Sequence, residues 1–233
     1  MKKNIAVFAS GGGSNLQAII DACKLSKINA KVCVVICNNK NAHTLQRAAD
    51  EDIPAYHLVR SKNVNEKILG ERDISKQDTN KQVIDKQDTS KQVIGKQDTS
   101  KPDIVKHNIE EHDILSVLQK HDAHIIFLAG YLKKISPSVL TAYETYNIHP
   151  SLLPKYGGKG MYGINVHTAV ISAGEKETGI TIHRVDPDYD TGPIIAQRKI
   201  PVLPDDTPET LAKRVLEQEH IFIVEVLQEL ITV

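Results

Sequence analysis

The chain has few aromatic side chains and no long apolar run. It contains no tryptophan, and aromatic residues make up 4% of its 233 residues, against 40% for all hydrophobic types. The core must therefore be built mostly from Ile, Val, Leu and Ala. No apolar stretch is long enough to cross a bilayer, and the apolar run within residues 1–10 is too short for a signal peptide. We expect no membrane partner and interpret that run as a first strand.

An excess of charge of one sign is missing, and cysteine is scarce. Lys and Arg together number 29, as do Asp and Glu, so the formal net charge is zero. This balance argues against a nucleic acid as the main partner. The three cysteines, Cys23, Cys33 and Cys37, form no Cys-x-x-Cys pair. Their odd number predicts reduced thiols and a cytoplasmic location.

Strand-like and helix-like patterns alternate along most of the chain. Strands are expected at residues 4–9, 30–37, 55–59, 124–129, 145–149, 179–185 and 193–202, and helices at 16–23, 42–50, 109–120 and 166–173. A short helix is expected from Ser136, and a long one from Pro208 with Thr207 as its cap. This alternation predicts an α/β protein with a doubly wound, mostly parallel sheet. Because no helix pattern separates the last two strands, one edge of the sheet should be mixed.

One segment breaks the alternation. Residues 76–105 consist of three tandem decapeptides that each begin Lys-Gln-Asp-Thr, and residues 71–75 resemble a decayed further copy. Each unit offers about two apolar residues, too few for a core of its own. We interpret 71–106 as a flexible, low-complexity insertion within one domain that spans 1–233. A stacked solenoid and a docking repeat remain as alternatives.

A glycine-rich loop, Ser10–Asn15, joins the first strand to the first helix. Backbone N–H groups and the helix dipole make such a loop an anion site. The loop lacks the Gly-x-Gly-x-x-Gly pattern, because position 16 is Leu, and it lacks a Walker Gly-Lys-Ser/Thr. The sequence therefore predicts a monophosphate site in place of a dinucleotide site. The alternative is a plain turn capped by Ser14.

A polar pair ends the strand at residues 145–149. Asn147 and His149 are two positions apart, so their side chains face the same way, and Pro150 stops the strand. The amide can donate to a developing oxyanion and the imidazole can place a proton. The alternative is an Asn and a His that merely close a strand into a turn.

A carboxylate that could complete this pair lies in Val-Asp-Pro-Asp-Tyr-Asp-Thr-Gly-Pro. Asp186, Asp188 and Asp190 are all candidates, although each could instead be a turn residue that bonds its own backbone. His167 and His183 could be combined with His149 into a metal site. No cysteine or carboxylate completes a tight ligand set by spacing, so we expect no metal.

Three motifs together carry a family resemblance. Asn-Ile-His-Pro-Ser-Leu-Leu-Pro, Ser-Gly-Gly-Gly-Ser-Asn-Leu-Gln and Asp-Thr-Gly-Pro resemble the formyltransferases that use 10-formyltetrahydrofolate, most closely the branch that acts on glycinamide ribonucleotide (GAR) in de novo purine (IMP) biosynthesis. The resemblance covers residues 4–70 and 107–230. It implies a Rossmann-like formyltransferase fold, direct formyl transfer from 10-formyltetrahydrofolate to the GAR amine without a covalent enzyme intermediate, and a monomer or homodimer.

The resemblance also implies roles for the polar residues. Asn147 would stabilise the oxyanion, His149 would polarise the formyl oxygen or shuttle a proton, and Asp190 would hold the imidazole or take the amine proton through water. The substrate phosphate would be bound by Gly12, Gly13, Ser14 and Asn15. Glu219 matches a position that touches the glycinamide end, with a solvated helix face as the alternative.

A folate pocket is implied by Leu128–Ile135. Its expected members are Tyr131, Leu132, Lys133, Lys134 and Ile135, together with Asn147 and Asp186. Lys133 stands where an Arg is often found, which puts a bidentate side-chain contact in doubt, so backbone contacts at Lys134 and Ile135 are expected. The alternative is a solvent-facing basic turn. The glycine-rich segment Lys155–Gly163 is a candidate lid.

Three rival functions remain open. Formyltetrahydrofolate hydrolase and methionyl-tRNA formyltransferase share the Asn-x-His segment but carry a regulatory or an RNA-binding domain, which we do not expect here. The Ser14-Asn15 phosphate loop favours a phosphorylated small substrate over both. The third rival is not an enzyme. It is a nucleotide-binding or scaffold protein in which the decapeptide repeats are the functional part.

Overall fold

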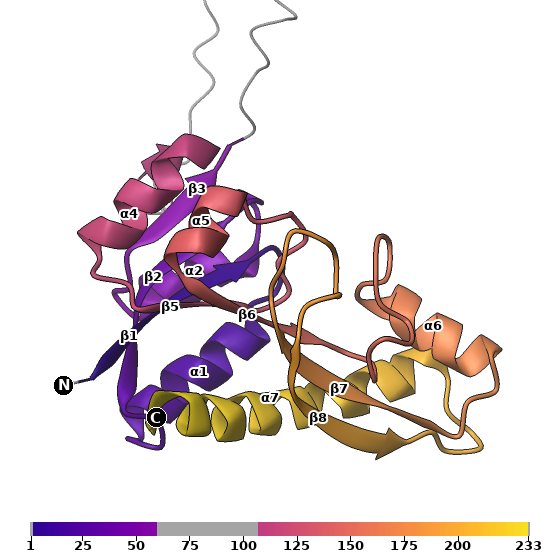
Figure 1. The fold of residues 1–233 in the computed structure, drawn as a ribbon. Helices are drawn as coiled ribbons and strands as arrows, with labels where there is room; N and C mark the ends of the chain where they lie inside the picture. The colour runs from indigo at the N-terminus through magenta and orange to yellow at the C-terminus, as the bar shows by residue number, and fades with distance from the viewer. Residues whose placement is uncertain (1, 60–106, 233) are drawn as a thin grey trace, which may run out of the picture. The chain divides into compact units, whose positions relative to one another are not determined.

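The computed structural model of the chain describes residues 2–59 and 107–232, which belong to one compact unit (Figure 1). The predicted insertion at 71–106 lies outside the described residues. Its flexibility, and the extent of a single domain over 1–233, therefore stay predictions.

The described strands form one sheet with the order β4-β3-β2-β1-β5-β6-β7-β8. They are β1 (Lys3–Ala9), β2 (Ala30–Cys37), β3 (Ala55–Leu58), β4 (His107–Ile109), β5 (Ile125–Leu128), β6 (Glu144–His149), β7 (Glu177–Arg184) and β8 (Ile194–Pro201). Strands β1 to β6 pair in parallel, whereas β7 is antiparallel to both β6 and β8. The predicted doubly wound, mostly parallel sheet with a mixed edge is confirmed.

Helices cover both faces of this sheet, as Figure 1 shows for α4 and α5 on one side and α1 and α7 on the other. The helices are α1 (Ser14–Lys24), α2 (His43–Asp50), α4 (Ile114–Lys120), α5 (Pro137–Ala142), α6 (Ile164–Ser172) and α7 (Pro208–Thr232), with a 3₁₀ turn, η1, at Glu111–Asp113. Side chains of β1 alternate between two cores. Ile5 and Val7 pack with α1 and α7, while Phe8 packs with α4 and α5.

The expectation of a helix over residues 109–120 is wrong for the first five residues. Residues 107–109 form the short strand β4 beside β3, and α4 begins only at Ile114. A capping box separates the two elements, in which the Glu110 backbone N–H donates to Asp113 Oδ2 at 2.9 Å. The expected cap of the last helix is confirmed, because Thr207 Oγ1 accepts from the Thr210 N–H at 3.3 Å.

The strand order brings the loops after β1, β5 and β6 together at the carboxyl ends of these central strands. β1 lies between β2 and β5, so the chain leaves β1 and β5 in opposite directions along the sheet, and a crevice opens at this switch point. The loops after β1 and β5 are bonded directly, since the Ser10 N–H donates to the Gly130 carbonyl at 3.1 Å and the Leu132 N–H donates to Ser10 Oγ at 3.0 Å. The fold thus fixes the walls of a site.

Gly179 provides a test of the antiparallel edge. A Cβ there would overlap the Arg198 carbonyl oxygen of β8 and lie 2.5 Å from the Leu152 side chain. We expect Gly179→Ala to lower the free energy of unfolding by about 2–3 kcal/mol, measured by urea denaturation. Gly11→Ala is the control, because a Cβ at Gly11 meets nothing within 4 Å. Equal midpoints for the two variants would contradict this packing.

Candidate active site

The crevice contains a cavity of about 780 Å³. Its wall is formed by the loops after β1, β5, β6 and β7, by α6 and by α7. Among its lining residues are Gly12, Gly13, Ser14, Asn15, Tyr131, Leu132, Asn147, His149, Asp190 and Glu219. The structure therefore brings the predicted phosphate loop, the polar pair and Asp190 to one cavity.

The carbonyl groups of the glycine-rich loop are held from outside the cavity. Thr44 Oγ1 donates to the Gly11 carbonyl at 2.8 Å, and Arg47 Nε donates to the Gly12 carbonyl at 2.9 Å. Both side chains come from α2. Gly13 has φ 72° and lies so close to Thr44 that a Cβ would be 2.7 Å from its Oγ1. The contacts from α2 thus fix the loop, and the N–H groups of the first turn of α1 lie where the loop meets the cavity.

Asn15 and Glu219 form a buried pair at the same end. Asn15 Nδ2 donates to Glu219 Oε2 at 2.8 Å, and the two residues are 8% and 6% exposed. Burial raises the pKa of the Glu219 carboxyl to about 7, against the opposing effect of the Asn15 hydrogen bond. The alternative of a solvated helix face for Glu219 is therefore wrong, whereas its contact with the glycinamide end of the substrate stays a prediction. Asn15 Oδ1 is also buried, with no partner among the described residues.

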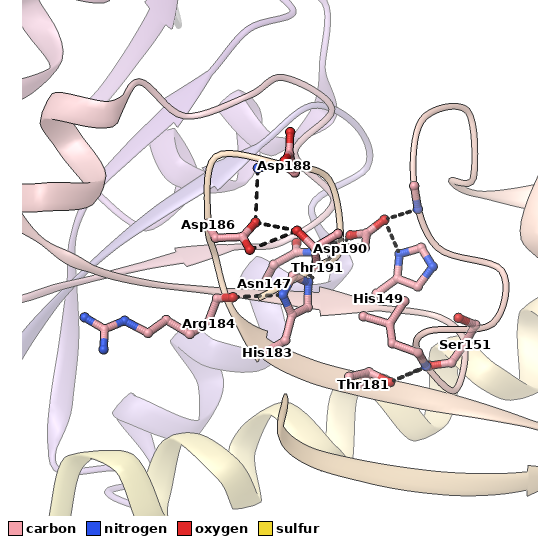
Figure 2. Close-up of polar contacts among 12 residues, drawn as sticks. Asn147, His149, Ser151, Thr181, His183, Arg184, Asp186, Asp188, Asp190 and Thr191 are labelled. Carbon is pink, nitrogen blue, oxygen red and sulfur yellow. Dashed lines mark hydrogen bonds and ion pairs between the residues drawn. The ribbon is translucent and has the colours of Figure 1, made fainter. Parts of the chain in front are cut away.

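Three predicted catalytic side chains converge in the middle of the cavity, as Figure 2 shows. Asn147 and His149 project from β6 toward Asp190, which follows β7. Asn147 Nδ2 lies 3.5 Å from Asp190 Oδ1, and His149 Nδ1 lies 3.6 Å from Asp190 Oδ2. The alternative of a simple strand-ending turn does not account for this convergence.

Asp190 is held as a carboxylate. Burial pushes its pKa upward, but the neighbouring groups, among them the Gly158 amide, outweigh burial and keep the pKa below its usual value. The Gly158 N–H donates to Asp190 Oδ2 at 2.8 Å. Asp186 instead acts as a turn residue, since it accepts from Thr191 Oγ1 at 2.8 Å.

His149 is held as a neutral imidazole. Its Nε2 lies 2.8 Å from the Tyr156 carbonyl, which can only accept, so Nε2 carries the hydrogen. Burial lowers the pKa of His149, and the charge of Asp190 and the Tyr156 carbonyl only partly oppose this. Nδ1 therefore carries a lone pair, at a distance from Asp190 that is longer than a hydrogen bond.

The segment Lys155–Gly163 forms one wall of the cavity. The contacts above tie it to His149 through Tyr156 and to Asp190 through Gly158. Gly158, Gly160 and Gly163 all have positive φ. In the described part of the chain, Lys159 is the one lysine or arginine that lines the cavity. The segment's movement as a lid stays a prediction.

A second hollow of about 60 Å³ adjoins the first and shares Tyr131, Asn147 and Asp190 with it. The expected folate residues Lys133, Lys134, Ile135 and Asp186 line it. Their side chains differ: Ile135 is buried, whereas Lys133 and Lys134 are exposed, and Lys134 Nζ donates to Asp188 Oδ1 at 3.2 Å. Backbone contacts in this hollow are therefore compatible with a basic outer surface.

Residues 2–59 and 107–232 contain no group of three or more His, Cys, Asp or Glu that could hold a metal ion. His167 is buried near His149, and burial lowers its pKa to about 4. Over the same part of the chain, no helix combines the length and apolar character that a membrane span requires.

Thr44 and Arg47 belong to this site, although sequence patterns did not indicate them, and so does His183, which the sequence suggested only as a possible metal ligand. Thr44 and Arg47 lie in a helix pattern, and only the folded chain brings them against the loop. His183 Nε2 lies 3.0 Å from Asn147 Nδ2.

A phosphate-type loop beside an Asn-His-Asp cluster on this fold defines the class of protein. A family model described as formyl transferase matches residues 3–227, and the chain belongs to this family. The resemblance inferred from the three motifs is thereby confirmed.

Within this family, the chain is similar to relatives and solved structures that are named for one substrate, glycinamide ribonucleotide. The chain is 37% identical over 231 residues to the chloroplastic phosphoribosylglycinamide formyltransferase of Vigna unguiculata, covering 98% of this chain and 61% of the relative. It is 33% identical to phosphoribosylglycinamide formyltransferase of Escherichia coli K12, covering 93% and 82%. It is similar to the crystal structure of glycinamide ribonucleotide transformylase 1 from Geobacillus kaustophilus, with 33% identity, a TM-score of 0.71 and coverage of 99% and 100%.

The coverage of the relatives differs. The chain spans 61% of the Vigna unguiculata protein and 64% of the Arabidopsis thaliana protein, both chloroplastic, which is less than two thirds of each. It spans 95% of phosphoribosylglycinamide formyltransferase of Bacillus subtilis, at 32% identity. The match therefore extends nearly end to end in the Bacillus subtilis relative.

We expect Asp190→Asn to lower the pKa of His149 further. The carboxylate raises that pKa by its charge, so its removal leaves burial less opposed. An NMR titration of the histidine ring carbons measures the change. His121 at the end of α4 is the internal control and should keep its pKa. A His149 pKa that stays constant or rises would contradict the electrostatic coupling.

We expect Glu219→Gln to change how stability depends on pH. The folded chain keeps the Glu219 proton up to pH about 7, whereas the ordinary value is 4.5. The native state thus binds more protons in this window, so this group lowers stability by about 3 kcal/mol as pH rises from 4.5 through 7. Denaturation of the Gln variant should show a flatter profile and higher stability at pH 8.

The control for this measurement is Glu229→Gln, because Glu229 is exposed on the same helix. It should keep the wild-type profile. A Glu219→Gln profile that overlays the wild type would show that Glu219 titrates as an ordinary carboxyl.

Proposed function

We propose that the chain transfers a formyl group from 10-formyltetrahydrofolate to the amine of glycinamide ribonucleotide, a step of purine biosynthesis. The observation that carries the proposal is the single cavity that joins the braced phosphate loop to the Asn147–His149–Asp190 cluster. The names of the relatives, phosphoribosylglycinamide formyltransferase, support this substrate.

The phosphate of the ribonucleotide binds at the N-terminus of α1. Backbone N–H groups from Gly12 to Asn15 donate to its oxygens, and the helix dipole favours its charge. Next to this end, the unpartnered Asn15 Oδ1 and the Glu219 carboxyl offer acceptors to substrate N–H and O–H groups. The amine end of the substrate then extends toward His149 and Asp190.

The folate binds along the residues of the adjoining hollow and extends into the larger cavity, because a hollow of about 60 Å³ is too small to contain it. The backbone of residues 131–135 borders it, and Asn147 and Asp190 lie where the hollow meets the larger cavity. This placement fits a co-substrate whose reactive end must reach the cluster while its ring lies beyond. When bound, 10-formyltetrahydrofolate supplies the formyl carbon that the amine attacks.

Asn147, His149 and Asp190 have different roles in the transfer. Asn147 donates an amide hydrogen to the formyl oxygen, on which negative charge develops. The lone pair of neutral His149 Nδ1 and the Asp190 carboxylate accept the proton that the attacking amine loses, directly or through water. The proton is then available for the folate nitrogen that leaves. No side chain has to act as a nucleophile, so transfer is direct.

The same proposal extends to the setting of the reaction. The partners are small molecules, with no nucleic acid and no metal, and the chain acts in the cytoplasm as a monomer or homodimer. The balanced charge of 29 basic and 29 acidic residues supports the absence of a nucleic-acid partner.

Formyl transfer to glycinamide ribonucleotide should be lost in two variants. We expect His149→Ala and Asp190→Asn to lower kcat by about a hundredfold or more, because each removes one proton-handling group. The measurement is tetrahydrofolate formation with both substrates present. Asp50→Asn, which changes an exposed carboxyl at the end of α2, is the matched control and should retain wild-type turnover.

Other outcomes identify the rivals. Folate cleavage without the amine substrate would indicate a hydrolase, and formylation of methionyl-tRNA would indicate the tRNA enzyme. A folded chain with no turnover on any of these substrates would refute the proposed function.

A further inference from the structure

His183 lies at the centre of the polar cluster without a role in the steps above. It stands on β7 directly opposite Asn147 of β6 in the antiparallel register, and it is 2% exposed. Figure 2 shows its ring beside the Asn147 side chain and below Asp190, while the Arg184 side chain points away from the cluster. The ring is therefore placed to act on Asn147.

The hydrogen bonds of His183 define its tautomer. Nδ1 lies 3.0 Å from the Arg184 carbonyl oxygen, which can only accept, so Nδ1 carries a hydrogen. Nε2 lies 3.0 Å from Asn147 Nδ2, an amide nitrogen that can only donate, so Nε2 carries a lone pair. An imidazole that donates through one nitrogen and accepts through the other is neutral.

The carbonyl that sets this tautomer is itself fixed by the Asp-Thr-Gly-Pro turn. A Cβ on Gly192 would overlap the Arg184 carbonyl oxygen, so only glycine fits there. The Arg184 N–H donates to the Pro193 carbonyl at 2.9 Å. The pairing of β7 with β8 shifts between Ile182 and His183, and such bulges re-aim side chains near active sites.

The second hydrogen of the Asn147 amide is held only loosely. Its nitrogen is 3.5 Å from Asp190 Oδ1, at the long limit of a hydrogen bond, against 3.0 Å to His183. The lone pair of His183 Nε2 accepts from Asn147, because the Asp190 carboxylate is 3.6 Å away and has no hydrogen to donate. One N–H of Asn147 is thus committed to His183 and the other is available.

We propose that His183 is a positioning residue for formyl transfer, which holds the Asn147 carboxamide so that its free N–H faces the reacting oxygen. The inference rests on the proposed function for its catalytic consequence. Without an acceptor at Nε2, the carboxamide can turn by half a rotation and present its oxygen lone pairs to the developing negative charge. That orientation would repel the charge it must stabilise.

The tautomer is tested without substrates. Nitrogen-15 NMR of the histidine rings at pH 8 should show His183 as a neutral imidazole with its hydrogen on Nδ1. In the same spectra the Asn147 side-chain amide should exchange slowly with water in the wild type and rapidly in His183→Leu. A hydrogen on Nε2, or a charged ring, would overturn the inference.

The catalytic consequence is tested with a pair of variants. His183→Leu removes the acceptor and should lower kcat at least tenfold, with KM for both substrates changed less than threefold. His183→Gln places an acceptor oxygen near the position of Nε2 and should restore kcat to within about threefold of the wild type. His121→Leu is the matched control, because His121 is half-buried and bonded to the Tyr56 hydroxyl away from the cavity.

The outcomes separate this inference from the proposed function. Unchanged kcat in folded His183→Leu, or no rescue by His183→Gln, would overturn the positioning role while wild-type turnover upholds the proposed function. A wild type without turnover would refute the proposed function, and the nitrogen-15 spectra and amide exchange would still decide the orientation of Asn147.

Discussion

The antiparallel pairing of β6 with β7 is the constraint on which the candidate site depends. It sets Asn147 opposite His183 and His149 opposite Thr181 in a sheet whose other central strands run parallel. β7 runs back along β6 from its carboxyl end, since His149 pairs with Thr181 and Tyr146 with Arg184, and the loop after β7 then places Asp190 beside Asn147 and His149. A shift of one residue in this register would turn Asn147 and His149 to the opposite face of the sheet.

The cluster concentrates polar groups that would be costly to bury singly. Asp190 remains a carboxylate because the Gly158 N–H and the Asn147 amide face it, and His149 stays neutral because burial outweighs the charge of Asp190. A base and an acceptor therefore coexist within a few ångströms at neutral pH. At the other end of the cavity, Glu219 retains a proton until about pH 7, so its charge responds to the pH range in which the site would work.

The sequence was sufficient for elements with strong local signals. The glycine-rich loop after β1, the Asn-x-His pair before Pro150 and the cap at Thr207 each follow from adjacent residues, and the structure has them in those places. The strand β4 has three residues and too little pattern to be separated from the helix that follows. The burial of Glu219 and the bracing by Arg47 could not be predicted, because they arise from contacts between segments far apart in the chain.

The account's central claim is direct transfer between two substrates held in one joined cavity, without a formyl group on the protein. The most direct measurement is incubation of the chain with 10-formyltetrahydrofolate labelled in the formyl carbon, followed by glycinamide ribonucleotide. The account predicts an unlabelled protein and no tetrahydrofolate until the amine is added, and then one labelled product per tetrahydrofolate formed. A labelled protein, or tetrahydrofolate released before the amine is present, would contradict it.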